Sequence, residues 1–402
     1  MRLRVTSRLL IPIFTFAAVG LSTSSIGSAY GAVPLNHFHP MSPVTHRITA
    51  RVIPDIGSTT WVNLIASGAP PEARAQASAV YDPVSDDMTI FGGCNILPCL
   101  NDVWVLSNAD GHATSTWLQL NPVGGPPSGR GLQTSVYDPG TNSMIMFGGN
   151  PNEGSCNVEA ANDTWVLTGA NGFGTSAWTQ LSPAGTLPGP RDGHSAVYDV
   201  ATNRMIVFGG ADACGVYYND VWVLSNANGL GGMPAWTHLA VTGTPPAVRA
   251  LHSAVYDPNT NRMIVYGGSN TSNIFSDVWV LTDANGLAVG GSPHWTQLSP
   301  AGSPGARYSH TAVYDSATNR MTVFAGVLGG NQTNDVWVLS QANGKGAAPT
   351  WNMLTPTGGP PPVREQHTAV FYNPARHRMI VFSGNGGNPP LYNDVWVLTN
   401  TP

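Results

Sequence analysis

The sequence carries little charge and almost no lysine. Only 10% of its 402 residues are Asp, Glu, Lys or Arg, and Lys345 is the only lysine. The formal net charge is −5, so the chain is weakly acidic. A protein of this composition offers no broad basic surface to nucleic acid or to anionic lipid. We therefore expect no nucleic-acid partner.

Long hydrophobic runs are also absent. The apolar stretch Leu9–Leu21 has thirteen residues, which is short of the ~20 that a membrane-spanning helix needs. It follows arginines at positions 2, 4 and 8 and precedes a small-residue region, Ser22–Ala32. This order is typical of a secretory signal peptide, which we assign to residues 1–31. We expect a secreted protein, extracellular or periplasmic, without stable membrane insertion.

Glycine, proline and aromatic residues are abundant instead. The chain has 46 Gly, 33 Pro, 12 Trp, 12 Tyr and 11 Phe. Without the three leader arginines, 14 basic and 22 acidic residues remain, which gives a formal net charge of −8. So many aromatic residues argue against a disordered chain. The composition indicates short strands joined by many turns.

The twelve tryptophans fall into two series of six with the same period. Successive members of each series lie 56 to 61 residues apart. A fixed period of this kind indicates a repeat architecture. The first series is Trp61, Trp117, Trp178, Trp236, Trp295 and Trp351, and the second is Trp104, Trp165, Trp222, Trp279, Trp337 and Trp396.

The fourth repeat shows the unit. Residues 249–257 read as a first strand, a, and residues 262–268 as strand b, after a turn rich in Pro, Asn and Thr. Strand c covers residues 276–281 and strand d residues 295–298. Each run is short, rich in Val, Tyr, Trp and Thr, and bounded by turn residues. Four such strands recurring six times predict an all-β fold, a six-bladed β-propeller of four-stranded antiparallel blades.

The repeat begins and ends out of phase. It starts with a lone strand d at Trp61–Leu64 and ends with a lone strand c at Asp394–Leu398. We predict that the N-terminal strand completes blade six and closes the ring, because this pairs two strand edges that would otherwise be exposed. The propeller then covers residues 58–402, after a lead-in segment at 32–57. We expect a monomer.

Four motifs of the repeat resemble those of the kelch repeat. They are Arg-x-x-His-Ser-Ala-Val-Tyr, Phe-Gly-Gly, Asn-Asp-Val-Trp-Val-Leu and a later Trp-x-x-Leu, and they span residues 61–398. In these motifs the chain resembles bacterial exported kelch proteins and the central propeller of galactose oxidase. The copper oxidase activity is disfavoured, because all four cysteines lie in b–c loops with apparent disulfide partners and no accessory domain supplies the remaining ligands. We expect no cofactor.

One arginine begins strand a in every repeat, at the channel mouth on the face where the b–c and d–a loops meet. Guanidinium groups converging there could bind a carboxylate or a sulfate in a bidentate manner. The alternative is that each pairs within its own blade, with the Asp of the Asn-Asp-Val-Trp element. A residue that recurs in every blade favours the structural role. The six are Arg74, Arg130, Arg191, Arg249, Arg307 and Arg364.

A histidine follows four of these arginines three positions later. The two remaining repeats have Ala77 and Gln133 there. A metal site needs ligand atoms close together, and blades arranged around a ring rarely bring four together. We expect these histidines to bond the neighbouring blade, and we predict no metal site. The four are His194, His252, His310 and His367.

Residues that depart from the repeat are better candidates for specificity, because function is grafted onto a fold at such positions. Asp192 and Glu365 follow channel-mouth arginines, and the sibling repeats have no acid there. A pair such as Glu365 with His367 could serve acid–base catalysis. The candidates for ligand contact are Tyr217, Tyr308, Asn270 and Asn331.

The four cysteines predict two disulfides, because an exported protein can form them. Cys94 and Cys99 bracket four residues of the first b–c loop, and Cys156 and Cys214 occupy the b–c loops of repeats two and three. Loops on one face of neighbouring blades can bring Cα atoms within the ~4.4–6.8 Å that a disulfide requires. We predict the pairs Cys94–Cys99 and Cys156–Cys214, with free thiols as the alternative.

Two functions fit the sequence. The first is a binding module for an extracellular or cell-surface protein or glycan, because the b–c loops vary around a fixed frame. The second is a carbohydrate-active enzyme, similar to exported kelch epimerases, with its site at the channel mouth. A pocket where a carboxylate and a histidine converge would favour the enzyme, whereas arginines tied to their own blades favour binding, the hypothesis we prefer. The variable loops are 94–100, 150–161, 211–218, 269–275, 327–333 and 385–392.

Overall fold

The computed structural model describes residues 58–95, 98–151, 160–287, 291–367, 369–373, 376–387 and 390–402. Strands, turns and irregular segments make up these ranges. The signal peptide predicted at 1–31 and the lead-in segment at 32–57 lie outside the described residues. No helix in the described part of the chain is long and apolar enough to cross a membrane.

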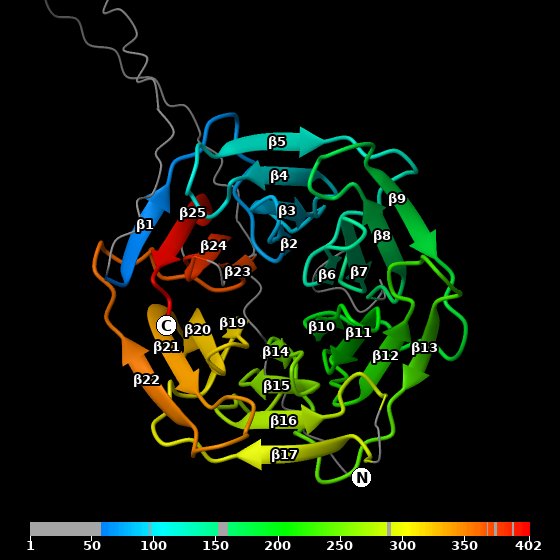
Figure 1. Ribbon diagram of the computed structural model, residues 1–402, viewed down its shortest axis with the longest axis vertical. Helices are drawn as coiled ribbons and strands as arrows, with labels where there is room; N and C mark the ends of the chain where they lie inside the picture. Colours follow the sequence, from blue (N-terminus) through cyan, green and yellow to red (C-terminus); the bar gives the residue numbers. More distant parts are fainter. Residues whose placement is uncertain are drawn as a thin grey trace, which may run out of the picture. The chain divides into compact units, whose positions relative to one another are not determined.

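Six antiparallel sheets stand around a common centre, with strand a innermost and strand d at the rim (Figure 1). Blades one to three contain β2 (Ser78–Asp82), β3 (Asp87–Phe91), β4 (Val103–Ser107) and β5 (Thr116–Leu120); β6 (Thr134–Asp138), β7 (Ser143–Phe147), β8 (Thr164–Thr168) and β9 (Ala177–Leu181); and β10 (Ser195–Asp199), β11 (Arg204–Phe208), β12 (Val221–Ser225) and β13 (Ala235–His238).

The second half of the ring repeats the pattern. Blades four to six contain β14 (Ser253–Asp257), β15 (Arg262–Tyr266), β16 (Val278–Thr282) and β17 (His294–Leu298); β18 (Arg307–Tyr308), β19 (Thr311–Asp315), β20 (Arg320–Leu328), β21 (Asn331–Ser340) and β22 (Thr350–Leu354); and β23 (Ala369–Asn373), β24 (Arg378–Asn385), β25 (Leu391–Thr399) and β1 (Thr60–Leu64). The six-bladed propeller predicted from the two tryptophan series is confirmed.

The N-terminal strand closes the ring as predicted. β1 pairs with β25 in antiparallel register, from Thr60 opposite Thr399 to Leu64 opposite Val395. The order of the last sheet is therefore β1-β25-β24-β23, with the first and last described strands of the chain side by side. Figure 1 shows β1 in blue beside β25 in red.

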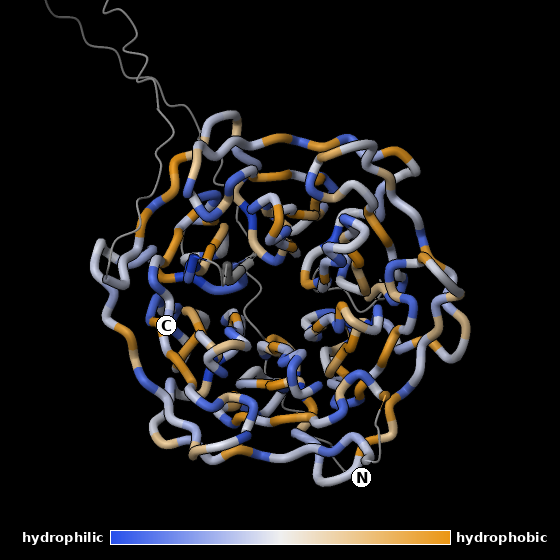
Figure 2. Tube along the Cα trace, in the orientation of Figure 1, coloured by the Kyte–Doolittle hydropathy of each residue, from blue (hydrophilic) through white to orange (hydrophobic). Residues whose placement is uncertain are grey.

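Aromatic contacts between blades explain the first tryptophan series. Each strand-d tryptophan packs against an aromatic residue of strand b in the preceding blade, with ring centroids 4.9–5.3 Å apart. Figure 2 shows apolar segments along the strands of every blade and hydrophilic ones in many connections. The pairs are Trp61–Phe324, Trp117–Phe382, Trp178–Phe91, Trp236–Phe147, Trp295–Phe208 and Trp351–Tyr266.

Blades five and six connect strands b and c differently from the other four. β20 runs to Leu328 and β21 begins at Asn331, so only Gly329 and Gly330 separate the two strands. The segment expected as a loop at 327–333 is therefore a β-hairpin. A register shift lies in each of these long pairs, between Phe324 and Gly326 in blade five and between residues 382 and 384 in blade six. In blade six β24 extends to residue 385 and β25 starts at 391, so the ends of the loop expected there are also strand.

Candidate functional site

The six arginines that begin strand a are buried, and each exposes 2% of its surface or less. Each guanidinium forms an ion pair with an aspartate of its own blade, with N–O distances of 2.5–2.8 Å. Of the two roles that the sequence left open, the structure shows the favoured one, pairing within the blade, and a ligand role for these groups has no support from their geometry. The pairs are Arg74–Asp102, Arg130–Asp163, Arg191–Asp220, Arg249–Asp277, Arg307–Asp335 and Arg364–Asp394.

Each of these aspartates joins two motifs of the repeat. Burial raises the pKa of Asp102, but the hydrogen bonds and charge of Arg74 outweigh it and hold that pKa below its usual value. The indole of Trp104 donates to Asp102 at 2.7 Å. The tryptophan of strand c makes the same bond in each of the remaining five blades. The second tryptophan series therefore serves the arginine–aspartate pairs.

A closed belt of backbone hydrogen bonds surrounds the channel just inside its mouth. The residue two positions after each arginine donates its N–H to the carbonyl of the corresponding residue in the preceding blade, at 2.8–3.1 Å. All six have positive φ, between 48° and 63°, which is uncommon outside glycine. Since each residue both donates and accepts, the belt links all six blades. Its members are Gln76, Leu132, Gly193, Leu251, Ser309 and Gln366.

The belt and the residues that follow it line a cavity of about 200 Å³. None of the described carboxylates lines this cavity. This cavity therefore does not bring a carboxylate and a histidine together, as an enzymatic site at the channel mouth would require. Seven lining side-chain atoms are buried without a hydrogen-bond partner: Oε1 of Gln76 and Gln133, Oγ of Ser309, and Nδ1 of His194, His252, His310 and His367.

The four histidines bond the neighbouring blade. Nε2 of His252 lies 2.8 Å from the hydroxyl of Ser195, and the other three reach the corresponding Ser or Thr hydroxyl. Burial, followed by the charge of Arg191, lowers the pKa of His194 to about 3, and burial lowers the pKa of the other three in the same way. His367 is thus neutral and its Nε2 is engaged, which makes it a poor partner for Glu365 in acid–base catalysis.

Asp192 and Glu365 lie in blades three and six, on opposite sides of the six-bladed ring. Asp192 accepts a hydrogen bond from Asn150 at 3.0 Å, and burial still raises its pKa to about 6. Glu365 accepts one from Gln332 at 3.0 Å, and burial raises its pKa as well. Each acid is thus held by an amide of the preceding blade, and their positions in the ring keep them from acting as a catalytic pair.

The two tyrosines predicted to contact ligand belong with these acids. Burial raises the pKa of Tyr217, and the charge of Asp192 adds to the shift. Burial also raises the pKa of Tyr308, with a contribution from the charge of Glu365. Each tyrosine is therefore close enough to one acid to be affected by its charge, and each acid directly precedes a residue of the belt.

The two asparagines predicted to contact ligand bond to backbone groups of nearby connections. Asn270 uses its side chain within its own loop region, since Nδ2 donates to the Val248 carbonyl at 3.0 Å and Oδ1 accepts the N–H of Ser272. Asn331 is exposed beside the hairpin turn of blade five, and its Nδ2 lies 3.5 Å from the carbonyl of Gly329.

The first predicted disulfide is confirmed. Cys94 and Cys99 are bonded, with Cα atoms 4.3 Å apart. Of the second pair, Cys214 is described, whereas Cys156 lies outside the described residues. The Cys156–Cys214 bond therefore stays a prediction.

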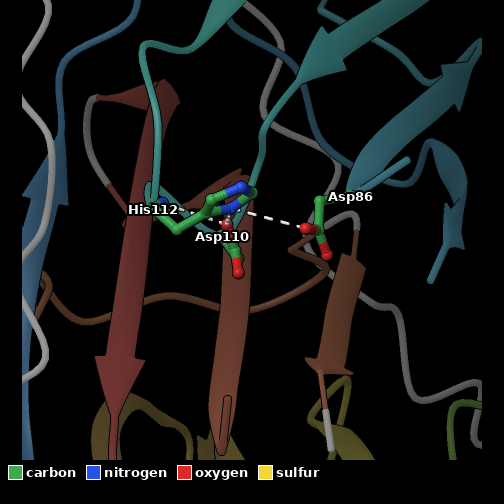
Figure 3. A group of neighbouring side chains, drawn as sticks. All are labelled: Asp86, Asp110 and His112. Carbon is green, nitrogen blue, oxygen red and sulfur yellow. Dashed lines mark hydrogen bonds and ion pairs between the residues drawn. The ribbon is translucent and has the colours of Figure 1, made fainter. Parts of the chain in front are cut away.

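Sequence reasoning missed an ionic cluster on the opposite face, in the a–b turn and c–d loop of blade one (Figure 3). Asp86 and Asp110 stand where blades two to five have an asparagine pair joined through its amides. Nδ1 of His112 lies 2.6 Å from Asp110 and 3.4 Å from Asp86. Arg376, from blade six, approaches Asp110 at 3.2 Å. Two aspartates replacing asparagines in one repeat were the available sequence signal.

The same cluster is the one group of described residues whose ligand atoms converge enough to hold a metal ion. The atoms of Asp86, Asp110 and His112 all lie within 4.8 Å of one another. Both carboxylates already face His112 and the guanidinium of Arg376, so a metal ion would have to displace a cation that is in place. We assign the cluster a structural role, in which Arg376 ties blade six to blade one.

Comparisons with known proteins agree with this architecture. The family model described as the KLHDC2/KLHL20/DRC7 Kelch-repeats domain matches residues 45–172, 154–287 and 289–401. The chain is 26% identical over 368 residues to "Putative adagio-like protein 2" of Oryza sativa subsp. japonica, and 24% identical over 357 residues to "Adagio protein 3" of Arabidopsis thaliana. These matches cover 87% and 86% of this chain but 52% and 53% of the relatives, so the chain spans about half their length.

A solved structure described as "Structure of YjhT" is similar in fold. It matches with a TM-score of 0.58 at 12% identity, over 81% of this chain and 95% of that one. At this identity the likeness concerns the fold alone. The family model, in contrast, matches nearly the whole ring that the structure shows, in three successive segments. The chain belongs to the kelch-repeat family.

Proposed function

We propose that this chain is an exported binding protein that holds a protein partner on its loop face, the face formed by the b–c and d–a connections. Kelch propellers are generally protein-interaction modules. The observation that carries the proposal is that the polar side chains that recur in every repeat form ion pairs and hydrogen bonds within their own blades. All six arginines pair with aspartates, and those aspartates also accept the c-strand indoles. Contact with a partner is thereby left to the loop residues that vary.

Exposed apolar side chains on the loop face support a protein partner. Val216 and Ile274, in the b–c loops of blades three and four, expose 54% and 42% of their surface. Leu187 and Val248, in the d–a connections that lead into the same two blades, are also exposed. Protein interfaces typically combine such apolar and aromatic residues with a polar rim.

Export is the second part of the proposal. The N-terminal arginines, the short apolar stretch and the small residues after it support a signal peptide. The Cys94–Cys99 disulfide supports an oxidising destination, extracellular or periplasmic. A glycan ligand and catalysis on a carbohydrate are the competing functions, and the test below separates them.

The proposal is tested with the mature protein, residues 32–402, immobilised on a support. Fractions of the growth medium and of the cell envelope of the organism that produces it are then passed over the support. V216D/I274D changes the loop face, and F173D/L230D is its control, because Phe173 and Leu230 are exposed apolar residues in c–d loops on the opposite face. Quantitative mass spectrometry should find a protein that wild type and the control retain and that V216D/I274D loses. Equal retention by all three forms would refute the loop-face proposal.

A glycan array and product analysis complete the test. If the chain retained a glycan but no specific protein, the ligand would be a glycan and not a protein. Release of a modified glycan would replace the binding function with an enzymatic one.

A further inference from the structure

The loop face carries negative charge that the blade pairs do not neutralise. Its six arginines and their six aspartates balance one another. The other described carboxylates of this face are Glu72, Asp192, Asp212 and Glu365. In the described b–c and d–a connections there is no further arginine and no lysine, because Lys345 and the remaining arginines belong to the opposite face. A binding partner of this face is therefore expected to bring positive charge.

The side chains that line the cavity contain buried hydrogen-bond acceptors without a partner. Nε2 of Gln133 donates to the carbonyl of Phe91 at 3.0 Å and to Ser78, which leaves its Oε1 as an unpartnered acceptor. Gln133 occupies the histidine position of its blade. His194 likewise reaches a hydroxyl of the preceding blade with Nε2, and the carbonyl of Phe147 is its backbone partner. Because a carbonyl can only accept, the proton lies on Nε2 and Nδ1 is left as an acceptor.

The cavity has no positive charge of its own among the described residues. The four imidazoles are buried and neutral, and the other lining residues are Gln, Ser, Thr, Leu, Ala and Gly. The buried acceptors around the cavity and the carboxylates at its mouth both disfavour an anion and favour a cation. The volume of about 200 Å³ exceeds that of a single water several-fold.

We propose, building on the loop-face binding function, that the channel cavity receives the cationic end of a partner's arginine or lysine side chain. Asp192 and Glu365 supply the negative charge at the mouth. Oε1 of Gln133 and Nδ1 of His194, both buried within the side chains that line the cavity, add partial negative charge that favours a cation there. Both acids are held by amides, Asn150 and Gln332, so their carboxylates are oriented before the ligand arrives.

The test uses two uncomplicated probes on the mature protein at low salt. Acetyl-tetraarginine amide carries the proposed group, and acetyl-tetracitrulline amide has nearly the same shape without the charge. Calorimetry should show binding of the arginine peptide at least about tenfold tighter than that of the citrulline peptide, weakening as salt is raised. Equal binding of the two peptides would overturn the proposal. Agmatine is a small molecule with a free guanidinium group. If it bound as tightly as the arginine peptide, the ligand of the cavity would be a small cation and not a side chain of a protein partner.

Variants locate the site. D192N/E365Q should weaken the arginine peptide by about tenfold, because two partly buried carboxylates are lost. The control E72Q removes a charge from the same face in blade one, where Glu72 is exposed, and should change the affinity less than about twofold. Unchanged affinity of D192N/E365Q refutes the site. If that variant melts early, E365Q alone decides, with loss of affinity at unchanged melting temperature as support and unchanged affinity as refutation.

The same variants separate this proposal from the proposed function. A protein partner lost by V216D/I274D but kept by D192N/E365Q would leave loop-face binding in place and refute the cation site. If the affinity for tetraarginine depended on Asp192 and Glu365 but no protein partner bound the loop face, the cation site would be supported and the loop-face function refuted.

Discussion

At the scale of single residues, the buried arginine of each blade joins three parts of the structure. Arg249 donates to both oxygens of Asp277 at 2.6 and 2.9 Å and to the carbonyl of Gly267 at 3.0 Å. Its guanidinium also lies 4.1 Å from the ring centroid of Phe275. A lysine could not reproduce this planar, bidentate geometry. The residue therefore secures the b–c loop as well as the blade.

Removal of this arginine should be costly. We expect Arg249→Met to lower the free energy of unfolding by about 3 kcal/mol, because Asp277 and the Gly267 carbonyl lose their donor in a buried place. Urea denaturation measures the change. The double variant R249M/D277N should recover part of the loss, since no unpaired carboxylate remains. A wild-type midpoint for R249M would contradict the structural role assigned to all six arginines.

At the scale of the element, ring closure depends on one five-residue strand. Trp61 of β1 exposes only 2% of its surface and packs on Phe324 with ring centroids 5.0 Å apart. Deletion of residues 58–66 should leave the β25 edge unpaired and lower the melting temperature strongly. Trp61→Ala should cost about 3–5 kcal/mol, and Trp61→Phe, which keeps an aromatic ring, clearly less. Calorimetry and light scattering follow these variants, and a deletion that melts like the wild type would refute this closure.

The elements also show what the sequence can and cannot predict. The two tryptophan series and the lone terminal strands were enough for the blades, their strand order and the closure. The belt was not predictable, because Gln76, Leu132 and Leu251 have positive φ without being glycine. That conformation follows from bonds between blades that are far apart in sequence. The hairpin of blade five was missed for a similar reason, since 327–333 varies in sequence like a loop.

The candidate site was predicted in part for the same physical reasons. Asp192, Glu365, Tyr217 and Tyr308 stood out because they break the repeat, and in the structure Tyr217 is affected by the charge of Asp192 and Tyr308 by that of Glu365. The arginines were also visible, but sequence alone left two roles open. Only the distances to the aspartates decide between a ligand and a blade partner.

At the scale of the whole molecule, four buried histidines from four blades link stability to pH. Burial lowers the pKa of His194 and His310 to about 3, and those of His252 and His367 also fall well below the ordinary 6.5. The unfolded chain therefore takes up protons that the folded chain refuses, and stability should fall as the pH drops below about 6.5. Asp192 acts in the opposite direction. Its pKa is raised to about 6 in the folded protein, so its contribution to the stability of the fold decreases as the pH rises from about 4 to 6.

Burial also raises the pKa of Glu365 and Asp87, but the four histidines, together with the lowered pKa values of the aspartates paired with arginine, outweigh these raised carboxyls. Acid should therefore destabilise the propeller. Blade two offers a matched replacement, since Gln133 makes the bonds between blades at the histidine position without titrating. We expect H252Q/H310Q to keep nearly the wild-type melting temperature at pH 7.5 and to lose less of it at pH 5, with H252A/H310A as the control that removes the bonds as well. Melting curves at the two pH values measure the difference. An equal loss in wild type and H252Q/H310Q would show that groups other than these imidazoles set the acid sensitivity.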